Sequence, residues 1–451
     1  MWPRCCRRRL PTPFTGTAWF WWSSIVPGPS GREGRVDVRK LAVDAKLASR
    51  RLAAATSTEK NQALLLMADA LERRMVEVLQ ENVQDVAAGR KKPLSAVQID
   101  TLLLDEHRLE VVTRELRTLA SMPDPVGEVV RGWITTDGLR IEKRRVPFGV
   151  ITVAYEARPS VTVDAAALCV KTGNAVILCG GVDSFASNRI LTEVLTGAVL
   201  EAGLPRASVQ FLASKDRADL AELLTQEDAV DLVVPRGGEL ARFVVENTHI
   251  PVITAAGGNC HVYVDRAAEL NQALAIAINS KVARPGVPNA AETLLVHEAV
   301  AEAFLPRIIK ELQDRKVKVY ACELTRTILG ELGHQLEEAT DGHWASEFQA
   351  MEMAVKVVKS LAEAVEHIGR YGTGHSEAIV TRDLEASTRF VDEVDAATVY
   401  VNASTRFTEG AALGLGGEIG VSTQKLHARG PLSLRELTTV KYVITGSGHT
   451  R

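Results

Sequence analysis

From Asp37 onward, hydrophobic positions are spaced as in amphipathic helices. Thr56 and Glu59 stand in the Thr-x-x-Glu spacing of a capping box, which is typical of a helix start. Apolar residues then recur every three or four positions, at Leu64, Ala68, Leu71, Met75 and Val78. This period predicts an N-terminal helical region, and the turn-forming run Asp124-Pro125-Val126-Gly127 ends it.

Two polar runs with an alternating pattern follow, on either side of Thr136-Asp137-Gly138. An Asp-Gly pair between alternating runs is a hairpin signal, so we expect an antiparallel arm within residues 124–145. A last strand candidate, Thr438–Thr445, is expected to pair with the hairpin of a neighbouring subunit. The arm therefore predicts a homo-oligomer.

After the hairpin, short apolar runs alternate with helical patterns. Strands are expected at Val150–Tyr155, Ala175–Leu178 and Val230–Val234, and a helix at Val161–Lys171. A second α/β unit follows Gly257-Gly258 and runs to about Tyr400. This alternation predicts an α/β fold with doubly wound parallel sheets, in which ligands bind at the carboxyl ends of the strands.

The composition excludes several classes of protein. The 451 residues are 46% hydrophobic, which suffices for the cores of two or three domains. A net charge of −3 does not indicate the excess of positive charge that is typical of nucleic-acid-binding proteins. No apolar run approaches the ~20 residues of a membrane span. The six cysteines form neither a disulfide framework nor a zinc spacing, so we expect reduced thiols, no metal and a cytoplasmic protein.

Residues 1–35 differ from the rest of the chain. They hold four of the six tryptophans, and six arginines against a single acid, Glu33. The apolar stretch Phe14–Val26 after a basic start resembles a targeting segment, but Gly16, Thr17 and two serines interrupt it. We interpret these residues as a foreign or disordered extension, with an early start codon and a targeting role as the open alternatives.

The remaining motifs are long and specific. They are Arg144-Arg145-Val146-Pro147-Phe148-Gly149-Val150, Tyr155-Glu156-Ala157-Arg158-Pro159, Lys171-Thr172-Gly173-Asn174-Ala175, Pro235-Arg236-Gly237-Gly238, Asn402-Ala403-Ser404-Thr405-Arg406-Phe407 and Ser422-Thr423-Gln424-Lys425-Leu426-His427-Ala428-Arg429-Gly430-Pro431. From about Val36 to its end, the chain resembles γ-glutamyl phosphate reductase, the proline-biosynthesis branch of the aldehyde dehydrogenase superfamily.

The resemblance implies a bidomain aldehyde-dehydrogenase-like fold. It places a cofactor-binding domain at residues 36–123 and 146–254 and a catalytic domain at 255–400. Residues 124–145 and 434–451 would form the oligomerisation arm. Residues 401–433 would carry the substrate loop and return the chain to the cofactor-binding domain.

The activity that the resemblance implies is NADPH-dependent reduction of L-glutamyl 5-phosphate to L-glutamate 5-semialdehyde and phosphate. In the family a cysteine attacks the acyl phosphate to form a thioester, and NADPH supplies the hydride. The cofactor-binding residues would be Lys171, Gly180, Gly181, Val182, Gly237 and Gly238. The residues that bind the glutamyl substrate would be Arg158, Arg284, Glu292, Asn402, Ser404, Thr405, Arg406 and Phe407. For the glycines a tight turn, and for Glu292 and Arg406 a structural ion pair, stay open as alternatives.

The catalytic positions depart from the family pattern Arg-Pro-x-x-Cys-Asn-x-x-Glu-Thr. Pro288 stands at the nucleophilic cysteine, beside the matching Asn289, and proline has neither a thiol nor a backbone N–H. Ser160 stands where an asparagine that binds the oxyanion is expected. Val182 replaces a lysine expected at the adenosine ribose or its phosphate, and no adjacent cation replaces it. These changes predict impaired catalysis and weak, poorly selective NADPH binding.

Two other functions remain open besides an impaired reductase. One is a pseudoenzyme that binds glutamyl ligands or partner subunits, such as an active paralogue or glutamate 5-kinase. The other is an acyl-phosphate hydrolase that needs no thiol. Cys260, just after Gly257-Gly258-Asn259, is the best candidate for a substitute nucleophile, although a small buried thiol is the commoner case.

The foreign composition of residues 1–35 leads to a first prediction. A chain that starts at Val36 should fold and melt like the full chain, because nothing in the composition assigns the extension to the core. Thermal unfolding of both proteins, followed by circular dichroism, measures this. A drop of many degrees on truncation would show that the tryptophan cluster packs on the body.

Overall fold

The computed structural model describes residues 36–255 and 257–451, so the expectations for residues 1–35 lie outside the described part. The N-terminal half contains the helices α1 (Val38–Ala53), α2 (Ser57–Arg73), α3 (Met75–Gly89), α4 (Ala96–Leu102), α5 (Glu106–Ser121), α6 (Ser160–Lys171), α7 (Phe185–Glu201), α8 (Arg217–Leu223) and α9 (Gly238–Asn247), with the 3₁₀ turns η1 (Val182–Ser184) and η2 (Arg206–Ser208). Its strands are β1 (Val129–Ile134), β2 (Arg140–Pro147), β3 (Val150–Tyr155), β4 (Ala175–Gly180), β5 (Val209–Phe211) and β6 (Leu232–Arg236).

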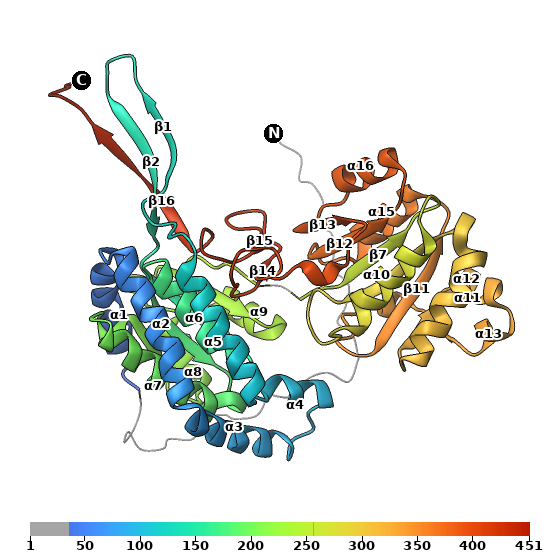
Figure 1. Cartoon of the computed structure of the whole chain (residues 1–451), viewed down its shortest axis with the longest axis horizontal. Coiled ribbons are helices and arrows are strands. Elements are labelled where there is room, and N and C mark those ends of the chain that lie inside the picture. Colours follow the sequence, from blue (N-terminus) through green and yellow to red (C-terminus); the bar gives the residue numbers. More distant parts are fainter. Residues whose placement is uncertain (1–35, 256) are drawn as a thin grey trace, which may run out of the picture. The chain divides into compact units, whose positions relative to one another are not determined.

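The C-terminal half alternates in the same way (Figure 1). Its strands are β7 (Cys260–Val264), β8 (Ala291–His297), β9 (Lys318–Ala321), β10 (Glu337–Glu338), β11 (Glu352–Val358), β12 (Ser376–Val380), β13 (Thr398–Val401), β14 (Val421–Ser422), β15 (Gly430–Pro431) and β16 (Thr438–Thr445). Its helices are α10 (Leu270–Val282), α11 (Glu298–Asp314), α12 (Glu323–Leu329), α13 (Glu331–His334), α14 (Asp341–Trp344), α15 (Leu361–Tyr371) and α16 (Leu384–Glu393), with the 3₁₀ turn η3 (Thr405–Phe407).

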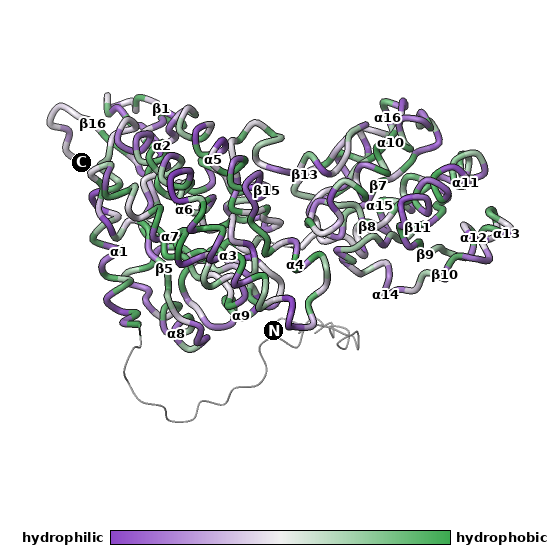
Figure 2. The backbone as a smooth tube through the Cα atoms, turned by 60° about the horizontal axis from the view of Figure 1, so that its bottom comes forward, coloured by the Kyte–Doolittle hydropathy of each residue, from purple (hydrophilic) through white to green (hydrophobic). Residues whose placement is uncertain are grey.

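Two parallel sheets carry the fold, which confirms the predicted α/β class. The first has the order β5-β4-β3-β6 and the second β10-β9-β11-β8-β7-β12-β13. Alternate strand residues enter different cores: Ile151 and Val153 pack on one face of the first sheet, and Ala154 and Ile177 on the other. Figure 2 shows hydrophilic and hydrophobic stretches alternating along the helices that cover these faces. Each sheet is therefore buried on both sides, as parallel sheets require.

The predicted hairpin is confirmed. β1 and β2 pair antiparallel around a turn in which Gly138 has φ +90°. β16 lies beside β2 in the same three-stranded arm (Figure 1) and pairs with it from Thr438 opposite Pro147 to Thr445 opposite Arg140. The hairpin that this last strand joins here is the chain's own, and its pairing with a neighbouring subunit stays a prediction.

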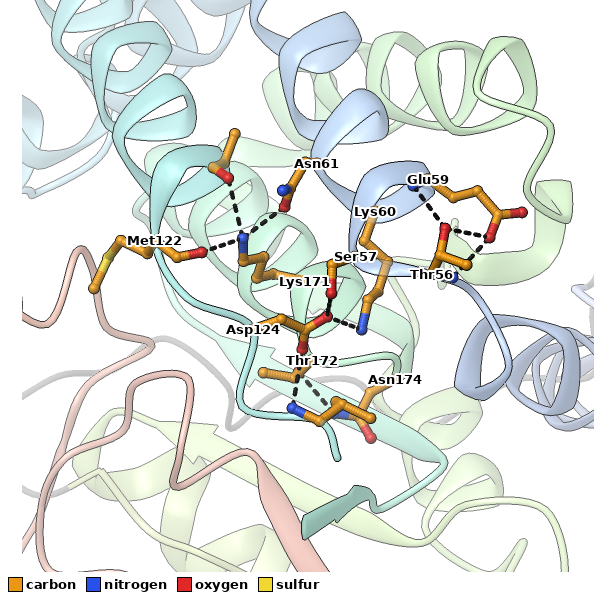
Figure 3. Close-up of polar contacts among 12 residues, drawn as sticks. Thr56, Ser57, Glu59, Lys60, Asn61, Met122, Asp124, Lys171, Thr172 and Asn174 are labelled. Atoms are coloured by element: carbon orange, nitrogen blue, oxygen red, sulfur yellow. Dashed lines mark hydrogen bonds and ion pairs between the residues drawn. The ribbon is translucent and has the colours of Figure 1, made fainter. Parts of the chain in front are cut away.

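A buried polar junction fixes the base of this arm. Figure 3 shows Asp124, where the chain leaves α5, held by the Lys60 ammonium at 2.5 Å and the Ser57 hydroxyl at 2.8 Å. The Asn174 amide donates to the Leu437 carbonyl at 2.8 Å, just before β16 begins. The capping box of Thr56 and Glu59 starts α2 beside this junction, as the sequence predicts.

Lys171 belongs to this junction rather than to a ligand site. Its side chain is fully buried at the end of α6, and the ammonium donates to Asn61 at 2.6 Å and to the carbonyls of Ala120 and Met122 at 3.1 and 2.7 Å (Figure 3). Ser160 begins the same helix, so the two predicted site residues lie at opposite ends of α6. The structure thus separates Lys171 from the residues with which it was expected to bind the cofactor.

These contacts predict that Lys171 stabilises the fold. The Lys171→Met substitution keeps the length of the side chain but leaves three buried acceptors without their donor, so it should lower the free energy of unfolding by roughly 3 kcal/mol or more. Lys441→Met, at an exposed position of the arm, should change it by less than ~0.5 kcal/mol. Chemical denaturation measures both values. Equal stability of the two variants would show that Lys171 does not support the junction.

Candidate active site

The segment that carries Pro288 connects α10 to β8 and is held from several sides. The Pro288 carbonyl accepts a hydrogen bond from the Cys260 thiol at 3.1 Å. Gly258 packs against the same peptide, because a Cβ there would lie 1.6 Å from the Pro288 oxygen. The Gly258 N–H in turn donates to the Glu347 carboxylate at 3.0 Å. The backbone at Pro288 is thus held in place by Cys260, Gly258 and Glu347.

Asn289 joins this segment to the predicted substrate loop. Its amide donates to the Thr408 carbonyl at 2.9 Å, and its backbone carbonyl accepts from the Thr405 hydroxyl at 2.7 Å. The Arg406 guanidinium donates to its side-chain oxygen. The fold therefore brings residues 284–290 and 402–407 together, as the resemblance implies.

Within the substrate loop, the predicted residues divide into two groups. Asn402 has φ +56° and binds the backbone of Thr381 with both ends of its amide, at 2.8 and 2.9 Å. Ser404 is buried and shares a hydrogen bond of 2.9 Å with Ser280. These side chains shape the loop. Arg406 is half-buried and Phe407 is 52% exposed, so these two remain accessible to a ligand.

Three arginines lie around the Pro288 segment. Arg158, at the carboxyl end of β3, donates to the Gly286 carbonyl at 3.2 Å. Its pKa is lowered to about 10 by burial first, and then by the nearby guanidiniums of Arg236 and Arg284. The carboxylates of Glu347 and Glu156 oppose this shift, so the arginines share the site with two acids. Sequence reasoning placed Arg236 in a motif but not in the site.

Ser160 is the first residue of α6, directly after Pro159. Its side chain is partly exposed, and within the described residues no hydrogen bond engages its hydroxyl. It is therefore available as a donor at the position of the missing asparagine, but with a shorter reach.

Glu292 is placed differently from the prediction. It lies fully buried on β8, where one carboxylate oxygen pairs with the Lys281 ammonium of α10 and the other accepts from the Gln349 N–H at 3.3 Å. Burial raises the pKa of this carboxyl, and Lys281 opposes that shift. Because both oxygens already have partners, the structural ion pair, and not contact with substrate, is the role that the structure supports.

Two partly buried acids, Asp164 and Glu418, were missed by sequence reasoning. Burial raises the pKa of Asp164 to about 8 and that of Glu418 to about 7, and in both cases the Arg236 charge opposes the shift. Glu418 stands in the run Gly417-Glu418-Ile419-Gly420, whose glycines were the one local signal that could have drawn attention to it.

No cysteine in the described residues replaces the lost thiol. Cys260 is fully buried, its thiol is used by the Pro288 carbonyl, and burial raises its pKa well above the usual value. Burial likewise raises the pKa of Cys169 and Cys179. Cys322 caps the start of α12 by accepting from the Thr325 N–H. Since the thiolate is the reactive form, Cys260 is a structural thiol and not a substitute nucleophile.

The cofactor side is formed by the carboxyl ends of β4 and β6. Gly180 is needed for packing, since a Cβ there would lie 2.0 Å from the Asn188 amide. Gly237 has φ +114°. A Cβ added at the adjacent Gly238 would have no atom within 4 Å. Gly238 begins α9, whose N-terminus has no side-chain cap.

The two helices at these strand ends differ. At α7 the carboxylate of Asp85 accepts from the N–H groups of Ala186 and Ser187, at 3.3 and 2.8 Å. The free N–H groups of a helix start attract anions, and the start of α9 has no side-chain cap, whereas Asp85 binds the start of α7. A Cβ at Gly237 would meet the Glu156 carboxylate, and Gly180 serves the turn that places Gly181 and Val182.

Comparison with known proteins decides the family. The sequence profile of the aldehyde dehydrogenase family matches residues 29–334 and 343–443. The gamma-glutamyl phosphate reductase of Moorella thermoacetica is 51% identical over 417 residues, which cover 92% of this chain and 99% of that protein. The chain belongs to the aldehyde dehydrogenase family, in its gamma-glutamyl phosphate reductase branch.

Solved structures agree with this assignment. The gamma-glutamyl phosphate reductase of Thermotoga maritima superposes with a TM-score of 0.87 at 43% identity, and covers 92% of this chain and 100% of its own. An acetylating aldehyde dehydrogenase from Geobacillus thermoglucosidasius shares the fold alone, with a TM-score of 0.68 at 17% identity. No helix among the described residues combines the length and apolarity needed to span a membrane.

The contact between Gly258 and Pro288 yields a prediction. Gly258→Ala should lower the unfolding temperature by many degrees, because the added Cβ would overlap the Pro288 carbonyl. Gly197→Ala, within α7 and with nothing within 4 Å of the added Cβ, should raise stability by up to ~1 kcal/mol. Differential scanning fluorimetry of the two variants tests this. Equal melting temperatures would show that the Pro288 segment is not held against Gly258.

Proposed function

We propose that this chain keeps the glutamyl-binding and cofactor-binding sites of the gamma-glutamyl phosphate reductases but does not catalyse their thiol-dependent reduction of L-glutamyl 5-phosphate. The observation that carries the proposal is Pro288. The reaction needs a thiolate that displaces phosphate from the acyl carbon, and proline has no sulfur and no N–H to stabilise the oxyanion. Among the described cysteines, none is exposed beside this segment.

Binding of a glutamyl ligand is supported by what surrounds Pro288. Arg158 and Arg406 both donate to the segment that carries it, one at Gly286 and the other at Asn289. Guanidinium groups bind carboxylate and phosphate oxygens in bidentate geometry, and a γ-glutamyl phosphate offers both. The proposed ligand is therefore a small glutamyl compound held by arginines, and the protein acts as a binding pseudoenzyme.

Cofactor binding is supported by the uncapped start of α9 and the glycines before it. When bound there, a nicotinamide nucleotide would supply the hydride of the family reaction. Gly237 and Gly238 would allow its phosphates to approach the backbone, since nothing lies within 4 Å of a Cβ at Gly238. We propose NADPH as the nucleotide.

Association with a second copy is also part of the proposal. The three-stranded arm exposes large apolar side chains on β1 and β16, namely Val129, Val130, Trp133, Ile134, Tyr442 and Ile444. Exposed apolar groups gathered on one projecting element are typical of a protein interface. We infer that the arm joins subunits of a homo-oligomer in the cytoplasm.

The proposal predicts no measurable oxidation of L-glutamate 5-semialdehyde with NADP⁺ by the chain as it stands. Pro288→Cys with Ser160→Asn should restore more activity than the two single changes together, because nucleophile and oxyanion donor act on one transition state. Pro285→Cys, which places a thiol elsewhere in the same segment, is the matched control and should stay inactive. Steady-state kcat/KM from NADPH absorbance measures all of them.

Turnover of the unchanged protein within about tenfold of a typical enzyme's ~10 s⁻¹ would refute this proposal. Phosphate release from L-glutamyl 5-phosphate without NADPH consumption would instead indicate the thiol-independent hydrolase. Full activity of Pro288→Cys alone would show that Ser160 suffices as the oxyanion donor.

A further inference from the structure

In the turn after β4, Val182 stands where the resemblance implies a lysine. Two lysines from other parts of the chain, Lys92 and Lys215, contact residues of this turn and of the helix that follows. Val182 begins η1 at the position of the family's lysine. Lys92, from the connection between α3 and α4, pairs with the carboxylate of Asp183. Lys215, from the connection between β5 and α8, lies with its ammonium 4.8 Å from the centroid of the Phe185 ring. The two lysines thus contact residues that follow Val182 directly, namely Asp183 and Phe185, although both are distant from it in sequence.

The position of Lys215 is fixed by its surroundings. The Phe185 and Phe211 rings pack at 5.5 Å and hold the start of α7 against β5. In the turn that follows β5, the Asp216 N–H donates to the Ser214 hydroxyl at 3.0 Å, and Asp216 caps α8 by accepting from the Ala218 N–H at 2.9 Å. Lys215 stands between these anchored residues and is exposed. Its ammonium is therefore placed over Phe185 by a rigid turn, yet accessible to a ligand.

Lys215 is accessible to a ligand, whereas Lys92 compensates the charge of Asp183. The side chains of Lys92 and Asp183 are 33% and 18% exposed, so their ion pair is partly shielded from water. An unpaired carboxylate next to Val182 would repel an anionic nucleotide. With its charge compensated by Lys92, Asp183 no longer opposes a phosphate that Lys215 attracts.

We propose that Lys215, assisted by the Lys92–Asp183 pair, binds the 2′-phosphate of an adenine nucleotide in place of the lysine missing at 182. The expectation of weak and unselective NADPH binding takes account of position 182 alone, whereas the fold brings these cations to the same turn. This inference rests on the proposed cofactor site and is independent of the chemistry lost at Pro288.

Isothermal titration calorimetry with 2′,5′-ADP and 5′-AMP tests it, because the two probes differ only in the 2′-phosphate. The unchanged protein should bind 2′,5′-ADP more tightly. Lys215→Ala should weaken that binding by about ten- to a hundredfold, the effect of one charge-assisted hydrogen bond, and leave 5′-AMP binding unchanged. Lys215→Arg should keep the preference.

Two further variants separate the roles of the lysines. Lys92→Ala should also weaken 2′,5′-ADP binding, and adding Asp183→Asn should restore it, because the unpaired carboxylate is then gone. Lys310→Ala removes an exposed lysine that pairs with Asp314 at 2.9 Å on α11, and should bind both nucleotides like the unchanged protein.

Equal affinity of the unchanged protein for the two nucleotides would overturn this inference and leave the proposed function intact. An undiminished preference in Lys215→Ala would overturn it as well. Failure to bind either nucleotide would overturn both the inference and the cofactor part of the proposed function.

Discussion

The central constraint in this structure is the fixation of the short segment between α10 and β8. The Pro288 peptide is held against Gly258 and Cys260, and Asn289 is bound by the substrate loop. Arg158 reaches the same segment from the end of β3, in the other sheet. None of these contacts uses the side chain or the backbone nitrogen of residue 288; the Cys260 thiol binds the Pro288 carbonyl. The contacts that hold the segment are therefore compatible with proline at 288, so the proposed loss of the thiol reaction does not require a change of fold.

The residues around the segment are likewise held by contacts that do not depend on the side chain at 288. The arginines around the segment bind its carbonyl and amide oxygens, so they contribute to stability whether or not a substrate turns over. Glu292 and Lys281 form a buried pair, and loss of either partner alone would leave an uncompensated charge in the core. The departures from the family pattern are at 288, 160 and 182, the positions to which the proposed function gives the catalytic and cofactor roles.

Sequence patterns predicted those parts of the structure that depend on nearby residues. The capping box at Thr56, the turn at Gly138 and the strand at Val150–Tyr155 follow from local spacing and were confirmed. Long-range pairing was not predictable in this way. The residues next to Lys171 in the sequence do not indicate that its ammonium binds Asn61 and Met122. In the same way, the sequence beside Val182 does not indicate the contact of Asp183 with Lys92, which lies 90 positions before Val182.

The central claim is that no residue of this chain forms a thioester with a glutamyl group. Intact-protein mass spectrometry after incubation with L-glutamate 5-semialdehyde and NADP⁺, without phosphate, tests it directly, because without phosphate a thioester formed by oxidation has no acceptor except water and accumulates. The account predicts that the unchanged protein keeps its mass, while Pro288→Cys with Ser160→Asn gains one glutamyl group. A glutamyl adduct on the unchanged protein, mapped to any of its cysteines, would contradict it.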